Sequence, residues 1–177
     1  MSKLLVIVDM QNDFIDGALG TPEAQAIVPA VIEKINTWDG DVVATQDTHK
    51  ANYLQTNEGK HLPVEHCMQD TAGWKLHPGV QEAIENKPHY LPFEKGTFGS
   101  MALAQHIRNH RYNYIELVGL CTDICVVTNA LLIKTYCPEE QVVVDASCCA
   151  GVTPTSHRAA LITMKQCQVD VTGVSAE

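Results

Sequence analysis

The chain alternates short, almost wholly apolar runs with longer stretches in which apolar residues recur at helical spacing. Continuous runs of Val, Ile and Leu are typical of parallel strands that are covered on both faces. Such runs predict strands at residues 4–8, 41–46, 114–120, 141–145 and 169–172. Apolar residues three or four positions apart predict helices near residues 22–38, 100–109, 123–136 and 156–167. Strands that alternate with helices build a parallel sheet with right-handed crossovers, so the predicted fold class is α/β.

Residues that favour helix ends support these boundaries. Thr21 is a cap candidate, and Pro22 follows it at the first position of the first predicted helix. Pro138 comes just after the third predicted helix, where the chain must leave the helical conformation. Ser156 is predicted to cap the fourth helix.

Residues 48–94 interrupt the alternation of strands and helices. The segment contains several histidines, prolines and glycines and has little periodicity. Long insertions without regular structure in compact domains are usually functional loops. We therefore expect this insertion to be a loop that lies over the functional edge of the sheet.

Composition narrows the class of protein. The 177 residues fit one domain, which we expect to span residues 1–177. A net charge of −9 argues against a nucleic-acid surface, which needs clustered Lys and Arg. The apolar runs are much shorter than the roughly 20 residues that span a bilayer, so no membrane association is expected. Seven cysteines without a signal peptide suggest reduced thiols in a cytoplasmic protein.

Three predicted strands end on residues that can do chemistry. The first ends on Asp9, the second on the segment Asp47-Thr48-His49, and the third just before the segment 121–125. In open α/β sheets, ligands bind at the carboxyl ends of the strands. The sequence therefore predicts that an acid, a possible metal-binding pair and a cysteine meet at one edge of the sheet.

Cys125 is the candidate nucleophile. A strand, a tight turn and then a helix place it in the first helical turn, where free N–H groups and the helix dipole favour a thiolate. The alternative is that it is one buried small residue among seven cysteines. Cys121 lies four positions earlier, which is the wrong spacing for a Cys-x-x-Cys redox pair. Lys95 alone would be a solvated charge, but beside Asp9 and Cys125 it would lower the pKa of the thiol.

Four segments together resemble the isochorismatase-like cysteine hydrolases, in order and spacing over nearly the whole chain. These segments are Asp9-Met10-Gln11-Asn12-Asp13-Phe14, residues 45–49, residues 94–98 and residues 119–126. The resemblance implies three layers, with helices on both faces of a doubly wound, mostly parallel six-stranded sheet. It implies a catalytic triad of Asp9, Lys95 and Cys125. It also implies a cis peptide before Cys121 and an oxyanion hole made by the N–H groups of Cys121 and Cys125.

Nicotinamidases, one branch of this family, hold a divalent metal ion with aspartate and histidines, some with an added glutamate. The resemblance assigns this role to Asp47, His49, Glu58 and His66, with His61 as a fallback ligand. The Asp-x-His spacing puts Asp47 and His49 on one face of a strand end. Such mixed donors suit Zn, with Fe or Mn as alternatives. The other interpretation of His49 and His66 is that they are ordinary loop histidines.

The resemblance implies hydrolysis of a small carboxamide through a thioester, with nicotinamide as the leading substrate. Many nicotinamidases have Trp-His-Pro where this chain reads Thr48-His49-Lys50, so one aromatic side chain is missing. The predicted pocket residues are Phe14, Phe98 and Leu120, with Trp74 as a further aromatic candidate. Core packing is the alternative for each of these aromatic residues.

Other functions stay open at this point. The alternatives are an isochorismatase, a hydrolase of N-carbamoyl or other small amides, and an inactive binding module. The family often forms dimers or tetramers, so we expect a homo-oligomer whose only other partner is a small amide substrate.

Overall fold

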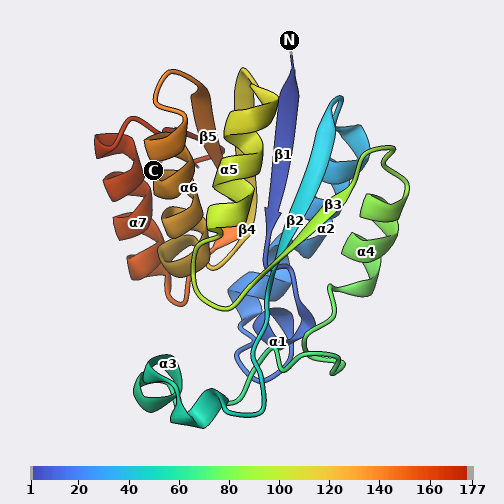
Figure 1. Ribbon diagram of the computed structural model, residues 1–177, viewed down its shortest axis with the longest axis vertical. Coiled ribbons are helices and arrows are strands. Elements are labelled where there is room, and N and C mark those ends of the chain that lie inside the picture. Colours follow the sequence, from blue (N-terminus) through green and yellow to red (C-terminus); the bar gives the residue numbers. More distant parts are fainter. Residues whose placement is uncertain (1, 175–177) are drawn as a thin grey trace.

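The structure, a computed structural model, describes residues 2–174 and contains a six-stranded, entirely parallel sheet (Figure 1). The strand order is β3-β2-β1-β4-β5-β6. The strands are β1 (Lys3–Val8), β2 (Asp41–Asp47), β3 (Leu91–Lys95), β4 (Tyr114–Leu120), β5 (Gln141–Ala150) and β6 (Asp170–Thr172). The predicted doubly wound α/β class is confirmed.

Helices cover both faces of the sheet (Figure 1). One face packs against α5 (Met101–His110), α6 (Val127–Tyr136) and α7 (Pro154–Gln166). The other packs against α1 (Asn12–Ile15), α2 (Pro22–Thr37) and α4 (Pro78–Glu85). Successive side chains of β1 point alternately into the two hydrophobic cores. Leu4 and Val6 pack on the side of α5, α6 and α7, whereas Leu5 and Ile7 pack on the side of α1, α2 and α4. This double burial explains why β1 is continuously apolar.

The strand order reverses between β1 and β4. From β1 the chain builds β2 and β3 to one side, and β4, β5 and β6 lie on the other side. The loops after two adjacent strands therefore diverge and leave a crevice at their carboxyl ends. Asp9 follows β1, and a π-helical turn (Thr122–Val126) follows β4 and leads directly into α6.

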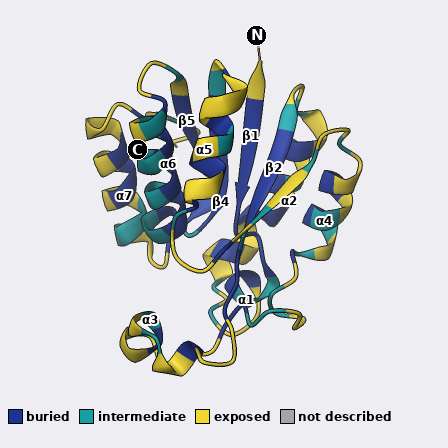
Figure 2. Cartoon of the chain, viewed as in Figure 1, coloured by how far each residue is buried: buried dark blue, intermediate teal, exposed yellow. Residues whose placement is uncertain are grey.

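The insertion after β2 is more ordered than we expected. It contains a 3₁₀ turn (Tyr53–Gln55), α3 (Asn57–His61), α4 and the edge strand β3. The prediction of a structureless loop is therefore wrong. The edge strand escaped prediction because it contains Pro92 and has a single buried residue, Lys95. The short α3 projects from the body of the fold, and much of its surface is exposed (Figure 2).

The predicted cap of the last helix is also corrected. Thr153, not Ser156, is the N-cap of α7, and Pro154 occupies the first helical position. Ser156 stands three residues later and completes a reciprocal capping box with Thr153. Among residues 2–174, every helix is too short or too polar to traverse a lipid bilayer.

Candidate active site and metal centre

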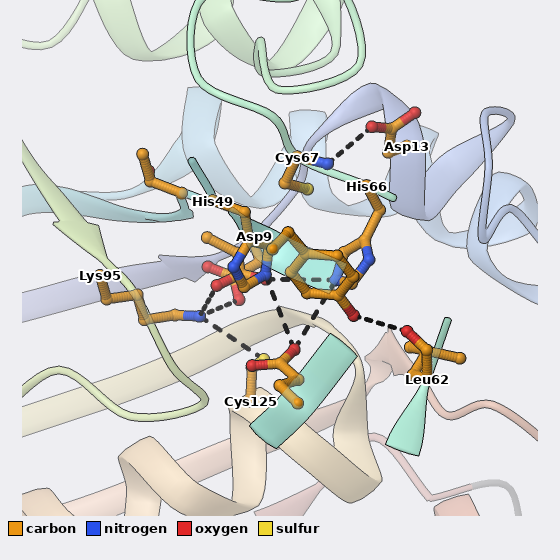
Figure 3. A network of polar contacts seen from close by, with 12 residues as sticks. Asp9, Asp13, His49, Leu62, His66, Cys67, Lys95 and Cys125 are labelled. Atoms are coloured by element: carbon orange, nitrogen blue, oxygen red, sulfur yellow. Dashed lines mark hydrogen bonds and ion pairs between the residues drawn. The ribbon is translucent and has the colours of Figure 1, made fainter. Parts of the chain in front are cut away.

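Three side chains from distant parts of the sequence meet at the crevice (Figure 3). Asp9 follows β1, Lys95 ends β3, and Cys125 lies in the π-helical turn after β4. The ammonium Nζ of Lys95 is 2.6 Å from Asp9 Oδ2 and 3.6 Å from Cys125 Sγ. All three side chains are buried. The structure thus brings together an acid, a cation and a thiol that are far apart in the sequence.

Asp9 is held by its neighbour on β2. Its backbone has a φ of +46°, which is uncommon for a residue other than glycine. The backbone N–H of Asp9 donates to the carbonyl of Thr45 at 3.2 Å. The hydroxyl of Thr45 donates to Asp9 Oδ1 at 2.6 Å. One oxygen of the carboxylate is therefore fixed, and Oδ2 faces Lys95.

The electrostatics favour a protonated thiol in the free site. Burial raises the pKa of Cys125 well above its usual range; the charge of Asp9 acts in the same direction, and Lys95 opposes both. Burial also raises the pKa of Asp9, against the attraction of Lys95. Burial alone would lower the pKa of Lys95, but Asp9 and Cys125 raise it, so the ammonium stays charged. At this thiol, the loss of solvation therefore outweighs the effect of the nearby cation on the pKa.

The turn that carries Cys125 has an unusual backbone. The peptide between Leu120 and Cys121 is cis. The carbonyl of Cys121 accepts hydrogen bonds from the N–H groups of Ile124 and Val126, both at 3.0 Å. The predicted oxyanion donors, Cys121 and Cys125, thus flank one compact turn. Cys121 forms no disulfide, and all seven cysteines are free.

A second cluster lies beside the first and contains the four predicted metal ligands. Asp47 is the last residue of β2, and His49 follows two positions later. Glu58 comes from α3, and His66 comes from the loop after that helix. One donor atom from each residue lies within 4.8 Å of all the others. His49 Nε2 is 3.0 Å from Asp47 Oδ2, and His66 Nε2 is 3.8 Å from Glu58 Oε1. Lys95 links the two clusters, since its Nζ is 3.5 Å from Asp47 Oδ1.

The donor set fits a divalent metal ion. His66 Nδ1 donates to the carbonyl of Val64 at 2.8 Å, which leaves the Nε2 lone pair directed at the cluster. Within residues 2–174, the buried Asp47 Oδ1 accepts no hydrogen bond. Burial alone would raise the pKa of Asp47, but His49, His66 and Lys95 hold it below its usual range. Two imidazoles and two carboxylates suit a borderline metal such as zinc.

The fallback ligand His61 and the cysteine next to His66 both lie outside this cluster. His61 is exposed, and its Nδ1 donates to the carbonyl of Asn57 at 2.8 Å. Cys67 is buried, and its backbone N–H donates to Asp13 Oδ2 at 2.7 Å. Neither side chain belongs to the group of converging donors found among the described residues.

Two neighbouring cavities lead to the thiol. The outer one, about 660 Å³, opens between α3 and the segment 96–98. The inner one is about 50 Å³ and reaches Cys125; among its lining residues are Phe14, Phe98, Cys121, His66 and Ile124. Both cavities share Glu58, Leu62, Phe98 and Ile124 as lining residues.

Two predicted pocket residues do not line these cavities. Leu120 is fully buried in the core layer that contains α2, because the last residue of β4 points into that layer. The indole N–H of Trp74 donates to Thr48 Oγ1 at 2.8 Å, and its ring packs against the same layer. Phe14 and Phe98 therefore remain as the aromatic walls.

The sequence did not reveal three residues that organise the site. The side-chain amide of Gln11 forms two hydrogen bonds with the backbone of Asp47. Its Oε1 accepts from the N–H of Asp47 at 2.7 Å, and its Nε2 donates to the carbonyl of Asp47 at 2.8 Å. Asn129 Nδ2 donates to the carbonyl of Cys125 at 2.8 Å. The ring of Tyr53 lies 4.6 Å from that of His49, centroid to centroid. The available signals were weak: a polar residue two positions after Asp9, and an asparagine one helical turn after Cys125.

Comparisons with known proteins show which family the chain belongs to. The family model of the isochorismatase domain matches residues 3–176. The chain is 32% identical to the nicotinamidase of Escherichia coli over 155 residues, covering 70% of this chain and 72% of that protein. The crystal structure of a Bacillus subtilis nicotinamidase/pyrazinamidase superimposes with a TM-score of 0.84 at 26% identity, covering 97% of this chain and 100% of that one.

A relative with a bound metal has the same fold. The structure of the Pyrococcus horikoshii pyrazinamidase in complex with zinc gives a TM-score of 0.79 at 25% identity, covering 98% of this chain and 100% of that chain. The matched family model spans both the triad and the four-donor cluster. The chain therefore belongs to the isochorismatase family of hydrolases, in the branch that contains the nicotinamidases.

Proposed function

We propose that the chain hydrolyses small aromatic carboxamides, with nicotinamide as the leading substrate, to the carboxylate and ammonia through a thioester on Cys125. The observation that carries this proposal is the position of Lys95, whose ammonium contacts both Asp9 and Cys125. A buried cation between an acid and a thiol is the arrangement needed to generate a thiolate when a substrate arrives. The nicotinamidase relatives favour a pyridine carboxamide.

In the first half of the reaction, Asp9 accepts the proton of the Cys125 thiol. Lys95 stabilises the resulting negative charge, and the sulfur attacks the carboxamide carbon. The N–H groups of Cys121 and Cys125 hold the oxyanion of the tetrahedral intermediate. Asp9 then gives its proton to the leaving nitrogen, so ammonia departs and a thioester remains. A carboxyl group with a raised pKa suits this exchange of one proton.

In the second half, water attacks the thioester carbon. Asp9 accepts a proton from the water, and the same N–H groups hold the second oxyanion. Collapse of this intermediate breaks the carbon–sulfur bond and releases the carboxylic acid. The sulfur recovers its proton from Asp9, and the site returns to its starting state.

Asp47, His49, Glu58 and His66 are the proposed ligands of a divalent metal ion. Zinc is the leading metal because the Pyrococcus relative was solved with zinc, and iron and manganese are the alternatives. A bound ion would supply a positive centre that attracts the lone pair of a ring nitrogen or a water molecule. Glu58 and His66 border the inner cavity that contains Cys125, so a group held there would lie beside the nucleophile.

The cavities limit the choice of substrate. Phe14 and Phe98 offer apolar walls to a flat ring. The outer cavity of about 660 Å³ leaves room for larger amides, which supports a second candidate, hydrolysis of N-carbamoyl or other extended amides. These two candidates use the same sulfur and differ in what fills the space beside α3.

Three further properties complete the proposal. The chain works as one domain over residues 1–177, since a single sheet organises the described residues. Seven free cysteines favour a reducing compartment, the cytoplasm. A homo-oligomer, dimer or tetramer, follows from the family resemblance, and light scattering of the purified protein would measure it.

The test is ammonia release from a panel of nicotinamide, pyrazinamide, benzamide and an N-carbamoyl amide, using metal-loaded protein. We expect nicotinamide and pyrazinamide to be hydrolysed and Cys125→Ala to be inactive with an unchanged Tm. Benzamide lacks a ring nitrogen, so it reports whether that nitrogen matters. Turnover of nicotinamide by Cys125→Ala at a near-normal rate would refute the mechanism, and turnover of the N-carbamoyl amide alone would favour the second candidate.

A further inference from the structure

A histidine of α7, His157, forms a hydrogen bond with the turn that carries the proposed nucleophile Cys125. Thr122 lies between the two proposed oxyanion donors, Cys121 and Cys125, and is fully buried. Its hydroxyl Oγ1 is 2.8 Å from Nδ1 of His157, which belongs to the second turn of α7. This contact joins two segments that are 35 residues apart.

Several contacts hold the start of α7, which carries His157, against the rest of the fold. The capping box of Thr153 and Ser156 begins α7 just before it. Gly151 allows the close approach of this helix, because a Cβ at Gly151 would lie 2.9 Å from the Cβ of His157. The carboxylate of Asp123 accepts a hydrogen bond from the backbone N–H of Val152, 3.1 Å from Oδ1. The nucleophile turn therefore contacts α7 through Thr122 and the loop before α7 through the next residue, Asp123.

The chemistry of the pair suits an uncharged hydrogen bond. Burial lowers the pKa of His157; the charge of Asp123 opposes this shift and that of Arg158 adds to it. A neutral imidazole has one acceptor and one donor nitrogen, so the Thr122 hydroxyl has a partner in either tautomer. His157 and Glu23 both line a third cavity of about 280 Å³, which is separate from the two cavities that lead to Cys125.

Neither residue of the pair lines the two cavities that lead to Cys125. A change at Thr122 or His157 therefore acts on the reaction through the turn and not through contact with the substrate. The backbone N–H groups on either side of Thr122 must point at one oxygen atom for the oxyanion to be stabilised. An anchor at Thr122 restrains both of them at once.

We propose that His157 is a positioning residue, which holds Thr122 through the Oγ1–Nδ1 hydrogen bond and thereby fixes the oxyanion donors of Cys121 and Cys125. This inference rests on the proposed amide hydrolysis. It adds a role for α7, a helix that contributes no residue to the triad or to the metal cluster.

The test compares variants that remove or keep the hydrogen bond. Thr122→Val replaces the hydroxyl with a methyl group of similar size, and Thr122→Ser keeps the hydroxyl. His157→Ala removes the partner atom, and His157→Asn keeps a polar atom near the position of Nδ1. Thr163→Val is the matched control, because the Thr163 hydroxyl bonds only to its own helix, at Ala159. Tm measurements establish that each variant is folded.

We expect Thr122→Val and His157→Ala to lower kcat about 10- to 100-fold, with KM changed less than threefold. The double variant should lose no more than the worse single variant, because both remove the same hydrogen bond. Thr122→Ser and His157→Asn should recover most of the rate, and Thr163→Val should match the unmodified protein.

Alkylation of Cys125 by iodoacetamide separates this role from a loss of the thiol itself. That reaction forms no oxyanion, so its rate should stay within twofold in all folded variants. A rise in KM without a fall in kcat, or equal losses in alkylation and in turnover, would overturn the proposal. Additive losses in the double variant would overturn it as well. If no amide is hydrolysed by the unmodified protein, the proposed function fails first, and binding of an aldehyde analogue to Cys125, which does form an oxyanion, replaces kcat as the readout.

Discussion

The side-chain amide of Gln11 forms hydrogen bonds with both the N–H and the carbonyl of Asp47, at 2.7 and 2.8 Å. Gln11 lies two residues after Asp9, and Asp47 belongs to the four-donor cluster. The loop that carries the proposed proton carrier therefore also fixes the backbone of a proposed metal ligand. Gln11 is fully buried, so water cannot replace the hydrogen bonds that a substitution would remove.

Gln11→Met should therefore weaken metal binding. Loss of a residue that orients a metal ligand typically costs about 10- to 100-fold in affinity. Competition with a chromophoric chelator would measure the dissociation constant for zinc. The control is Gln81→Met on α4, where the amide only contacts Glu85 at the surface. An unchanged zinc affinity in a folded Gln11→Met protein would show that the Gln11–Asp47 hydrogen bonds do not contribute to metal binding.

Glu58 is the only cluster member that comes from the projecting helix α3, and it is more exposed than the other three. Glu58→Gln keeps the size of the side chain and removes its charge. We expect zinc affinity to fall about 10-fold, since a neutral amide is a poorer ligand than a carboxylate. His61→Asn changes the fallback candidate on the same helix and should leave the affinity unchanged. The reverse pattern would assign the fourth ligand to His61.

The thiol of Cys125 should respond to pH in a direction set by its burial. Because its pKa is raised in the folded protein, its thiolate fraction at pH 7 is below that of an ordinary cysteine. Alkylation of Cys125, followed by mass spectrometry of its peptide, should keep accelerating above the usual cysteine pKa of about 8.5. A plateau below pH 7 would contradict this expectation.

Lys95→Met should move that alkylation profile to still higher pH. The substitution removes the cation that opposes the effects of burial and of the Asp9 charge on the pKa of Cys125. Amide hydrolysis should fall about 10²- to 10⁴-fold, the usual range for a group that assists proton transfer. Lys60→Met on exposed α3 is the matched control and should leave both profiles unchanged. A profile that moved to lower pH would show that Lys95 does not stabilise the thiolate.

A separate polar network ties α2 to the sheet. Lys34 Nζ lies 2.6 Å from Glu116 Oε1 and 2.7 Å from Asp145 Oδ2. Removing one partner leaves two carboxylates without their cation. Because Lys34 is partly exposed, we expect Lys34→Met to lower the free energy of unfolding by about 2 kcal/mol, below the range for fully buried pairs. Urea denaturation would measure this, with Lys165→Met as the surface control.

The same network predicts how the stability of the protein changes at acidic pH. Burial alone would raise the pKa of Asp145, but hydrogen bonds from Lys34 and Ser147 lower it below its usual value. A carboxylate whose pKa is lowered in the folded state stabilises the protein above its unfolded pKa, about 3.9. That stabilisation disappears as the pH falls through the lower, folded-state value. The difference between the unmodified protein and Lys34→Met should therefore shrink below about pH 4.

The chain itself determined most of the architecture, because local patterns are enough to define it. The apolar run of β1 is typical of a strand buried on both faces, and Asp9 at its end was therefore expected at the ligand-binding edge. The spacing of Asp47 and His49 placed both on one face of a strand end. The motif around Cys125 placed the proposed nucleophile at a helix start. Each of these inferences depends on residues that are near each other in the sequence.

Only the tertiary structure decided which distant groups touch. β3 escaped prediction because an edge strand with a proline lacks the apolar pattern of a central one. Three further features depend on how separate elements pack. They are the burial of Leu120 in the core, the hydrogen bonds between Gln11 and Asp47, and the contact of Thr122 with His157. The raised pKa of Cys125 depends on the total burial of its site, which outweighs the effect of the neighbouring Lys95. Such effects arise from distances between segments across the fold, and the order of residues along one segment does not contain those distances.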